Sequence, residues 1–253
     1  MSEDLPPPIP AATLILMRPA GSRPPEILMM ERASTMTFAA GALVFPGGRI
    51  DPDDHATAAA VAPDVPDRAA RVAAIRETIE ETGIAPALTP VPDAEQAAAL
   101  RAGIGAGRPF AELLAEAGLS LELGALTPFA RWCPNFRETR RFDALFYLAE
   151  APRGMGDATA DKAEAVRTFW ASAADVLAEI EAGRARAIFP TRRNLERLAR
   201  FGSFEEARAD AERHSVQQIT PWIEEREGRR WLCIPEGIGY PVTSEPLETA
   251  MRR

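Results

Sequence analysis

Hydrophobic positions in the first fifty residues predict a run of strands. Residues 11–18, AATLILMR, form a continuous apolar run of the length of a buried strand. The proline-rich turn at 19–25 ends that strand, and residues 26–31, EILMME, predict a second one. A third apolar segment, 41–45, runs directly into Pro46, Gly47 and Gly48. The fold is therefore expected to begin with a sheet.

Residues 69–84 have the periodicity of a helix instead. At about 100° per residue one apolar stripe is formed by Val72, Ile75 and Ile79. Gly83 suits the left-handed position that ends a helix, and Asp67 is predicted to cap its start.

The rest of the chain predicts further strands and helices around this segment. Residues 93–119 read as two helices separated by Gly105–Gly107, and they form a wall over a site or a simple packing element. We also expect strands at 126–132, 142–148 and 163–170, helices at 173–181, 190–198 and 205–214, and a hairpin at 217–235 that turns at Glu227-Gly228. No internal repeat is visible. The pattern predicts one α/β domain at 11–253 after a flexible tail at 1–10, with insertions at about 51–67 and 93–123.

Composition narrows the classes of function. The 253 residues carry a formal net charge of −8, which argues against nucleic acid or an anionic membrane as partner. The two cysteines lack metal-binding spacing, and the two histidines are far apart, so a zinc or Ser-His-Asp site is not indicated. The acidic, proline-rich start is unlike a signal peptide, and no apolar run reaches about 20 residues. We expect a cytoplasmic protein, and leave a homodimer open.

The candidate chemistry lies on the predicted helix at 69–84. Glu77, Glu80 and Glu81 fall within an arc of about 100°, where they repel one another unless water or a cation offsets the repulsion. Carboxylates suit Mg²⁺ and bridging to substrate phosphates, although an exposed helix laced with ion pairs is the alternative. Arg76 stands at i,i+4 to Glu80 and can orient it. The preceding Gly47-Gly48 loop allows close backbone approach to phosphate.

These two pieces together resemble the Nudix hydrolase family, whose box is G-x5-E-x7-R-E-U-x-E-E-x-G-U. Gly48 matches the first glycine, and the second half is matched by Arg76, Glu77, Glu80, Glu81, Gly83 and Ile84. However, Gly48 and Arg76 are 28 positions apart, whereas the family has 14. The first glutamate of the box falls on Asp54 when counted forward or on Arg68 when counted backward, so its role is left open. Thr78 replaces a bulky aliphatic residue.

The resemblance implies a Nudix-type α/β/α sandwich with a mixed, mostly antiparallel sheet and helical insertions. It also implies Mg²⁺ or Mn²⁺ held by Glu77, Glu80 and Glu81, with Arg76 in support. Glu77 and Glu164 remain alternatives for the general base. The substrate implied is a small nucleotide that contains a diphosphate.

The interrupted box and its G-x3-F-P-G-G lead-in look like the branch that cleaves coenzyme A and acyl-coenzyme A. That branch implies a role for Arg32 upstream. The 3′-phosphate clamp is predicted from Arg137, Arg140 and Arg141, with Arg131 close by. Trp132 and Phe136 are candidates to stack an adenine, and ion pairs of the arginines with Glu138 and Asp143 are the alternative.

Two other functions stay open. One is a diphosphatase of ADP-ribose or NADH, and the other is a non-catalytic nucleotide-binding module with this fold. Loss of the ligand glutamates is the usual mark of such a module, and all three glutamates are present here.

Overall fold

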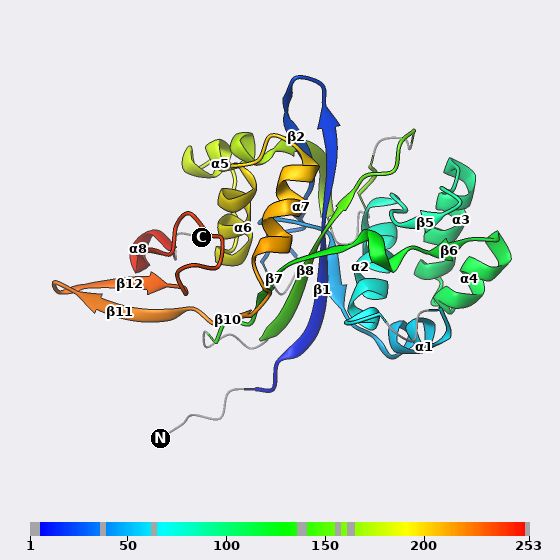
Figure 1. Cartoon of the computed structure of the whole chain (residues 1–253), viewed down its shortest axis with the longest axis horizontal. Helices are drawn as coiled ribbons and strands as arrows, with labels where there is room; N and C mark the ends of the chain where they lie inside the picture. The colour runs from blue at the N-terminus through cyan, green and yellow to red at the C-terminus, as the bar shows by residue number, and fades with distance from the viewer. Residues whose placement is uncertain are drawn as a thin grey trace.

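The structure is a computed structural model that describes residues 6–35, 39–61, 65–135, 141–154, 158–160 and 165–250. A mixed sheet crosses its middle (Figure 1). Its strands are β1 (Ile9–Ala20), β2 (Arg23–Arg32), β3 (Leu43–Val44), β4 (Gly47–Arg49), β7 (Thr127–Trp132), β8 (Phe142–Glu150), β9 (Ala165–Ser172) and β10 (Gln218–Ile219).

Most pairings in this sheet are antiparallel. The order along the sheet is β10-β7-β8-β1-β2-β3, while β4 joins β1 and β9 joins β2. Among the described residues, the β1–β8 and β10–β7 pairs are parallel and the other pairs are antiparallel. The mixed, mostly antiparallel sheet predicted from the sequence is confirmed.

Both faces of the sheet are buried. Side chains alternate along each strand, so neighbouring residues of one strand enter opposite cores. In β1, Leu14 and Leu16 enter one hydrophobic core, whereas Ile15 and Met17 enter the other. This two-sided burial explains why residues 11–18 read as a continuous apolar run rather than an alternating one.

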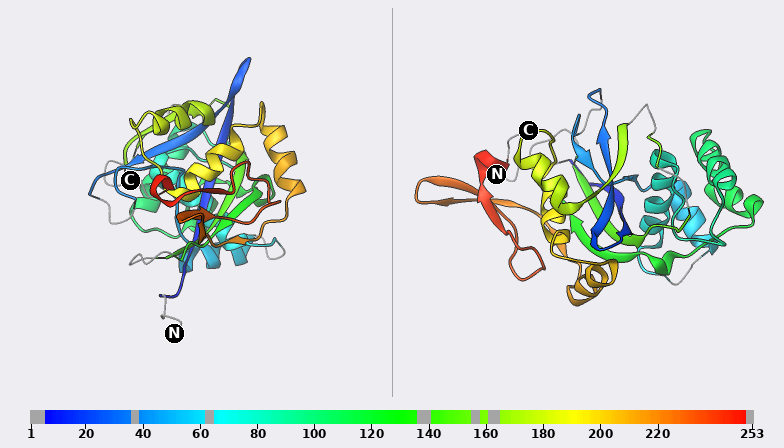
Figure 2. Two further views of the ribbon diagram at one scale, coloured as in Figure 1. Left: turned by 90° about the vertical axis from the view of Figure 1, so that its left-hand side faces the viewer. Right: turned by 90° about the horizontal axis from the view of Figure 1, so that it is seen from above.

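Helices cover each face, which makes an α/β/α sandwich (Figure 2). One layer contains α1 (Pro52–Val61), α2 (Arg68–Thr82), α3 (Ala94–Gly105) and α4 (Phe110–Ala117). The other contains α5 (Ala173–Glu181), α6 (Phe189–Leu198) and α7 (Phe204–Arg213). The predicted fold class is thus confirmed. No helix in the described ranges is long and apolar enough to span a bilayer.

Short elements complete the chain at both ends of the sandwich. Beside α3 and α4 lie β5 (Leu88–Thr89), β6 (Ser120–Leu121) and the 3-10 turn η1 (Leu123–Ala125). At the opposite end a separate sheet is formed by β11 (Trp222–Arg226), β12 (Arg229–Cys233) and β13 (Ser244–Pro246), followed by α8 (Leu247–Ala250). The predicted turn at Glu227-Gly228 connects β11 to β12.

One local prediction needs correction. Asp67 precedes α2, but it has a positive φ of 51° and its side chain makes no cap hydrogen bond, so it is not a side-chain N-cap. Within the predicted insertion at 51–67, residues 52–61 form α1. Gly83 does end α2 as predicted, with φ 73° and its N–H donating to the carbonyl of Ile79.

Candidate active site

The acidic helix α2 is buried on almost every side. Its apolar residues Val72, Ile75 and Ile79 have no exposed surface, and Arg76 and Glu81 are only 8% and 2% exposed. An acidic helix on a solvated surface would keep these charged side chains in water. The exposed-helix alternative therefore fails, because α2 holds charged groups inside the fold.

Arg76 is held by a carboxylate from the first insertion. Asp54, in the first turn of α1, is fully buried. Arg76 Nε and Nη2 donate to Asp54 Oδ1 and Oδ2 at 2.8 and 2.9 Å. The backbone N–H of Asp51 also donates to Asp54 Oδ2, at 2.8 Å. Asp54 thus occupies the supporting position that the sequence left open, and counting forward from Gly48 identifies it.

The same guanidinium connects two of the glutamates. Arg76 Nη1 lies 2.9 Å from Glu77 Oε1 and 3.4 Å from Glu80 Oε2. Burial alone would lower the pKa of Arg76, but hydrogen bonds and charge interactions with Asp54 and Glu77 raise it above its usual value. Arg76 stays protonated and orients the acidic side chains around it, more through Glu77 than through the predicted pairing with Glu80.

The glycine loop packs against the acidic side chains of α2. The N–H of Gly47 donates to Glu81 Oε2 at 2.8 Å. A Cβ at Gly48 would lie 2.6 Å from Glu77 Oε2 and closer still to its other carboxyl atoms. Only glycine leaves room for the carboxylate at that point. The structure therefore brings together the two halves of the interrupted motif.

The donor set fits a hard divalent cation. Glu77, Glu80 and Glu81 supply carboxylate oxygens, which Mg²⁺ and Mn²⁺ prefer, and the missing side chain at Gly48 is what makes room for the Glu77 carboxylate. Within the described ranges, no three Asp, Glu, His or Cys side chains already converge as a metal site. Glu77 instead pairs with Arg76, and Glu81 accepts the N–H of Gly47, contacts that orient the two carboxylates.

The predicted substrate clamp lies only partly within the described residues. Arg137, Arg140 and Glu164 are outside them. Arg32 ends β2, where it pairs with Ala165 in β9 and donates its N–H to the carbonyl of Ala42.

The side chains of Arg32 and Arg141 have unused donors. In both residues the Nε atom is buried and has no hydrogen-bond partner within the described part of the chain. Guanidinium groups are donors of the kind that binds anionic ligands.

Two neighbouring residues belong to the fold instead. Arg131 forms a two-point ion pair with Asp143, at 2.8 and 2.7 Å, which is the alternative considered above. Trp132 is 1% exposed, and it packs edge-on against Phe189 and Tyr240. It therefore cannot stack an adenine, and that interpretation was wrong for this residue.

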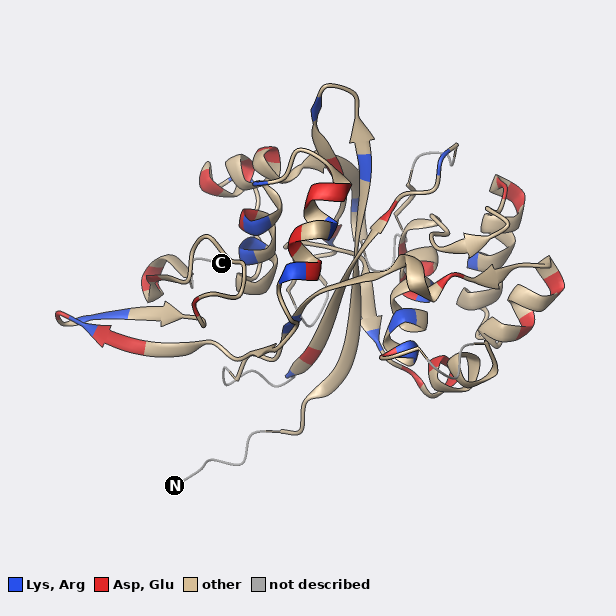
Figure 3. Ribbon diagram, in the orientation of Figure 1, with Lys and Arg blue, Asp and Glu red and all other residues tan. Residues whose placement is uncertain are grey.

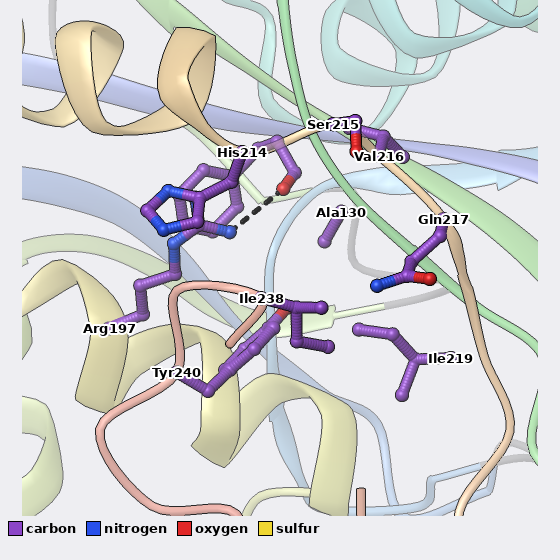
Figure 4. Close-up of a pocket in the computed structure, with 10 residues that line it drawn as sticks. Ala130, Arg197, His214, Ser215, Val216, Gln217, Ile219, Ile238 and Tyr240 are labelled. Atoms are coloured by element: carbon purple, nitrogen blue, oxygen red, sulfur yellow. Dashed lines mark hydrogen bonds between the residues drawn. The ribbon is translucent and has the colours of Figure 1, made fainter. Parts of the chain in front are cut away.

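A small cavity on the other side of the sheet is not part of this site (Figure 4). One of its lining residues is Arg197, whose guanidinium pairs with Asp210 at 2.8 Å and donates to the carbonyl of Phe129 at 3.0 Å. Arg197 also lies over the rings of Phe129 and Tyr240. Because its charge is already matched, we assign this arginine to packing between α6, α7 and β7.

Sequence reasoning missed one side chain at the site. Arg101 of α3 donates to the backbone carbonyls of Glu80 and Glu81 at the end of α2. No motif marks it, because its partners are backbone atoms 20 and 21 residues away. In Figure 3 acidic and basic positions are interspersed along the helices, so charge pattern alone does not distinguish this arginine either.

Comparison with known proteins shows the family. The crystal structure of a Nudix hydrolase from Alicyclobacillus acidocaldarius is 30% identical, with a TM-score of 0.69, over 80% of this chain and 96% of that one. The MutT protein of Methanosarcina mazei Go1 is 18% identical over 78% and 97%, with a TM-score of 0.44. The Nudix domain of Shewanella oneidensis NrtR, solved with ADP ribose, is 15% identical over 79% and 92%, with a TM-score of 0.45. No family model and no curated protein sequence matches.

The chain belongs to the Nudix hydrolase family. This conclusion rests on the Alicyclobacillus structure, whose whole length is nearly covered, and it agrees with the two halves of the box that meet at α2. The protein is accordingly a hydrolase that acts on diphosphate linkages. The more distant structures add nothing about its substrate.

Proposed function

We propose that the protein hydrolyses the diphosphate of coenzyme A or an acyl-coenzyme A, with Mg²⁺ or Mn²⁺ held by Glu77, Glu80 and Glu81. The observation that supports metal-dependent hydrolysis is the buried cluster at α2, where Asp54 and Arg76 support glutamates beside a glycine loop. The choice of coenzyme A rests on the resemblance of the interrupted box and its lead-in to that branch. Nothing in a purely structural helix requires this cluster of buried charge.

The proposed reaction adds water across the P–O–P linkage. The oxygen of water bonds to one phosphorus, the bridging P–O bond breaks, and the products are 3′,5′-ADP and a 4′-phosphopantetheine compound. The cation, when bound, would neutralise the diphosphate and lower the pKa of water. The proton of that water passes to a carboxylate, for which Glu77 and Glu164 are both candidates.

The residues of the chain have separate tasks in this proposal. Arg76 keeps Glu77 and Glu80 oriented, and Gly47 and Gly48 let the backbone approach the phosphates. Arg32 and Arg141, with their buried donors, are candidates to bind the anionic substrate, together with Arg137 and Arg140. The basic residues compensate locally for a chain whose net charge is −8.

The substrate is tested by product mass. The purified protein with Mg²⁺ or Mn²⁺ is given coenzyme A, acetyl-coenzyme A, ADP-ribose and NADH separately. Release of 3′,5′-ADP from the coenzyme A compounds alone is the expected result. Cleavage of ADP-ribose or NADH instead would contradict the coenzyme A proposal but keep the diphosphatase. Binding of one nucleotide without any cleavage would support the non-catalytic module.

The metal role is tested by Glu80→Gln. Glu80 is the most exposed of the three glutamates and keeps its shape in this variant, so folding should be nearly unchanged. We expect turnover to fall by about 10²-fold or more, because a neutral amide is a poor ligand for a hard cation. EDTA should abolish the activity of the unaltered protein, and added Mg²⁺ or Mn²⁺ should restore it. Turnover by Glu80→Gln equal to that of the unaltered protein would refute the metal site.

A further inference from the structure

The end of the acidic helix is closed by a side chain from the second insertion. The last four backbone carbonyls of an α-helix have no partner within it, and in α2 the first of these, of Ile79, accepts the N–H of Gly83, which leaves three. Arg101 Nε donates to the carbonyl of Glu80 at 2.9 Å, and Arg101 Nη2 donates to that of Glu81 at 3.2 Å. The third carbonyl, of Thr82, accepts the N–H of Thr159 at 2.9 Å. One guanidinium and one amide thus satisfy the three remaining carbonyls.

A further contact joins these two donors. Arg101 Nη1 donates to Thr159 Oγ1 at 2.8 Å. The segment 158–160 is in turn tied to β9, because Thr168 Oγ1 donates to the carbonyl of Ala158 at 3.0 Å. Arg101 therefore connects three parts of the molecule: α3, the last turn of α2, and the segment that leads towards β9. We call this arrangement the Arg101 clamp.

The clamp is mounted on a rigid element. Leu100 and Ile104 flank Arg101 on α3, and both are buried in the same hydrophobic core as Val72 and Ile79 of α2. Gly103 leaves no space for a larger residue, since a Cβ there would overlap the side chain of Leu113 in α4. The insertion is thus packed firmly against α2 and can hold the guanidinium in one place.

The two carbonyls that Arg101 contacts belong to residues whose carboxylates are expected to bind metal. A cation beside a helix C-terminus is favourable, because the last carbonyls carry partial negative charge. Here the positively charged group is the guanidinium of Arg101, which also contacts two adjacent carbonyls and so restricts the backbone torsions of Glu80 and Glu81. Fixing the backbone fixes the origin of each side chain.

We propose that Arg101 is a positioning residue of the diphosphatase site, which fixes the last turn of α2 so that Glu80 and Glu81 are preorganised for the divalent cation. This inference rests on the proposed function. It gives the second insertion a task other than the wall or the simple packing element considered from the sequence.

A variant without the guanidinium of Arg101 distinguishes two ways in which this residue can affect Mn²⁺ affinity, by positioning the helix end or through its charge alone. Arg101→Met keeps an unbranched stem of similar packing but removes the positive charge and all five donors. If charge alone mattered, losing a cation near the site would tighten Mn²⁺ binding. If position matters, the freed last turn must be ordered on binding, and affinity falls. The two explanations therefore predict opposite signs.

The experiment is a titration of the full-length protein with Mn²⁺, followed by electron paramagnetic resonance, alongside steady-state kinetics. For Arg101→Met we expect Mn²⁺ to bind about 10-fold more weakly and kcat to fall by about 10-fold, as for other residues that orient metal ligands. The KM for the nucleotide should change by less than about twofold. Arg101→Lys keeps the charge but not the two-carbonyl contact, and should recover only part of the loss.

A matched variant controls for changes to the insertion itself. Arg108, in the turn between α3 and α4, pairs with exposed Glu116 and contacts nothing in α2 that the structure describes. Arg108→Met makes the same chemical change on the same insertion and should leave Mn²⁺ affinity and kcat unchanged. Thr159→Val removes one clamp contact, and should weaken Mn²⁺ binding by about two- to threefold. This milder variant keeps the test decisive if Arg101→Met does not fold.

The outcomes distinguish the clamp from the proposed function. Arg101→Met that binds Mn²⁺ as tightly as Arg108→Met, or more tightly than the unaltered protein, overturns the positioning role. So does a loss of thermal stability with unchanged Mn²⁺ affinity, because it shows a merely structural contact. If the unaltered protein itself binds no Mn²⁺, the proposed function fails, and the inference fails with it.

Discussion

The ion pair between Asp54 and Arg76 makes a sharp prediction, because it joins the first insertion to the acidic helix. Asp54→Asn replaces a carboxylate oxygen with an NH₂ group. At the Oδ1 position that group would face Arg76 Nε, and at the Oδ2 position it would face both Arg76 Nη2 and the N–H of Asp51, all of which are donors. At least one hydrogen bond is lost, and the negative charge that matches Arg76 disappears inside the protein.

The size of the effect follows from burial and from the remaining partners. Removing one member of a buried ion pair costs about 3–5 kcal/mol of the free energy of unfolding. Arg76 keeps Glu77 at 2.9 Å and Glu80 at 3.4 Å, so its charge is not left unpaired. We therefore expect the lower end, about 3 kcal/mol, which corresponds to a fall in melting temperature of about 6–12 °C for a protein of this size.

Activity should fall as well. Without Asp54, Arg76 is drawn more strongly to Glu77 and Glu80, and these carboxylates become less available to a cation. We expect kcat to fall by about 10- to 100-fold, as for other residues that hold metal ligands in place.

The matched control is Asp51→Asn. Asp51 directly precedes α1, but its side chain is 47% exposed and 3.8 Å from Arg76, so the change should cost less than about 0.5 kcal/mol. Urea unfolding and turnover are measured for both variants. If Asp54→Asn is no less stable and no less active than Asp51→Asn, the supporting role of Asp54 is wrong.

Two further predictions concern the glycine loop and the core. Gly48→Ala should lower turnover by about 10- to 100-fold with little change in melting temperature, because the added Cβ displaces the Glu77 carboxylate. The control is Gly124→Ala, where a Cβ meets open space. Equal turnover by both variants would contradict the steric explanation. Burial raises the pKa of Tyr240 to about 12 from an unfolded value of about 10. The stability gained from its neutral phenol is therefore present below pH 10 and lost as pH rises towards 12. Tyr240→Phe loses the hydrogen bond from Trp132, so it should be less stable than the unaltered protein at pH 8. Between pH 10 and 12 it should lose less stability than the unaltered protein, as measured by urea unfolding. Equal losses by the two proteins would contradict the raised pKa of Tyr240.

The sheet could be predicted because its signal is local. A strand buried on both faces must be apolar at every position, and residues 11–18 satisfy that rule on their own. The acidic helix was equally clear, since its glutamates and its terminal glycine are contiguous. The spacing of residues in the sequence does not predict whether an aromatic side chain is buried or exposed. Trp132 and an exposed stacking tryptophan look alike in sequence, and only its packing against Phe189 and Tyr240 separates them.

The supporting residues of the site cannot be predicted from local pattern, because their partners are distant in the sequence. Asp54 and Arg76 are 22 residues apart with an insertion between them, so counting from either end of the motif gives a different partner. Asp67 looked like a cap because of its residue type, but its positive φ directs the backbone differently. Arg101 contacts only main-chain carbonyls of α2, and these are present whatever the partner sequence is. Such contacts are decided by tertiary packing.

The two insertions contact each other and together hold the acidic helix α2 in place. Asp54 in α1 holds Arg76 of α2, while the adjacent Asp53 accepts the N–H of Phe110, the first residue of α4, at 3.0 Å. Neighbouring carboxylates on the first insertion thus contact the acidic helix and the second insertion. The second insertion then returns to the end of α2 through Arg101. Because α2 is held from both insertions, the extra residues inside the box can lengthen the chain without separating its two halves.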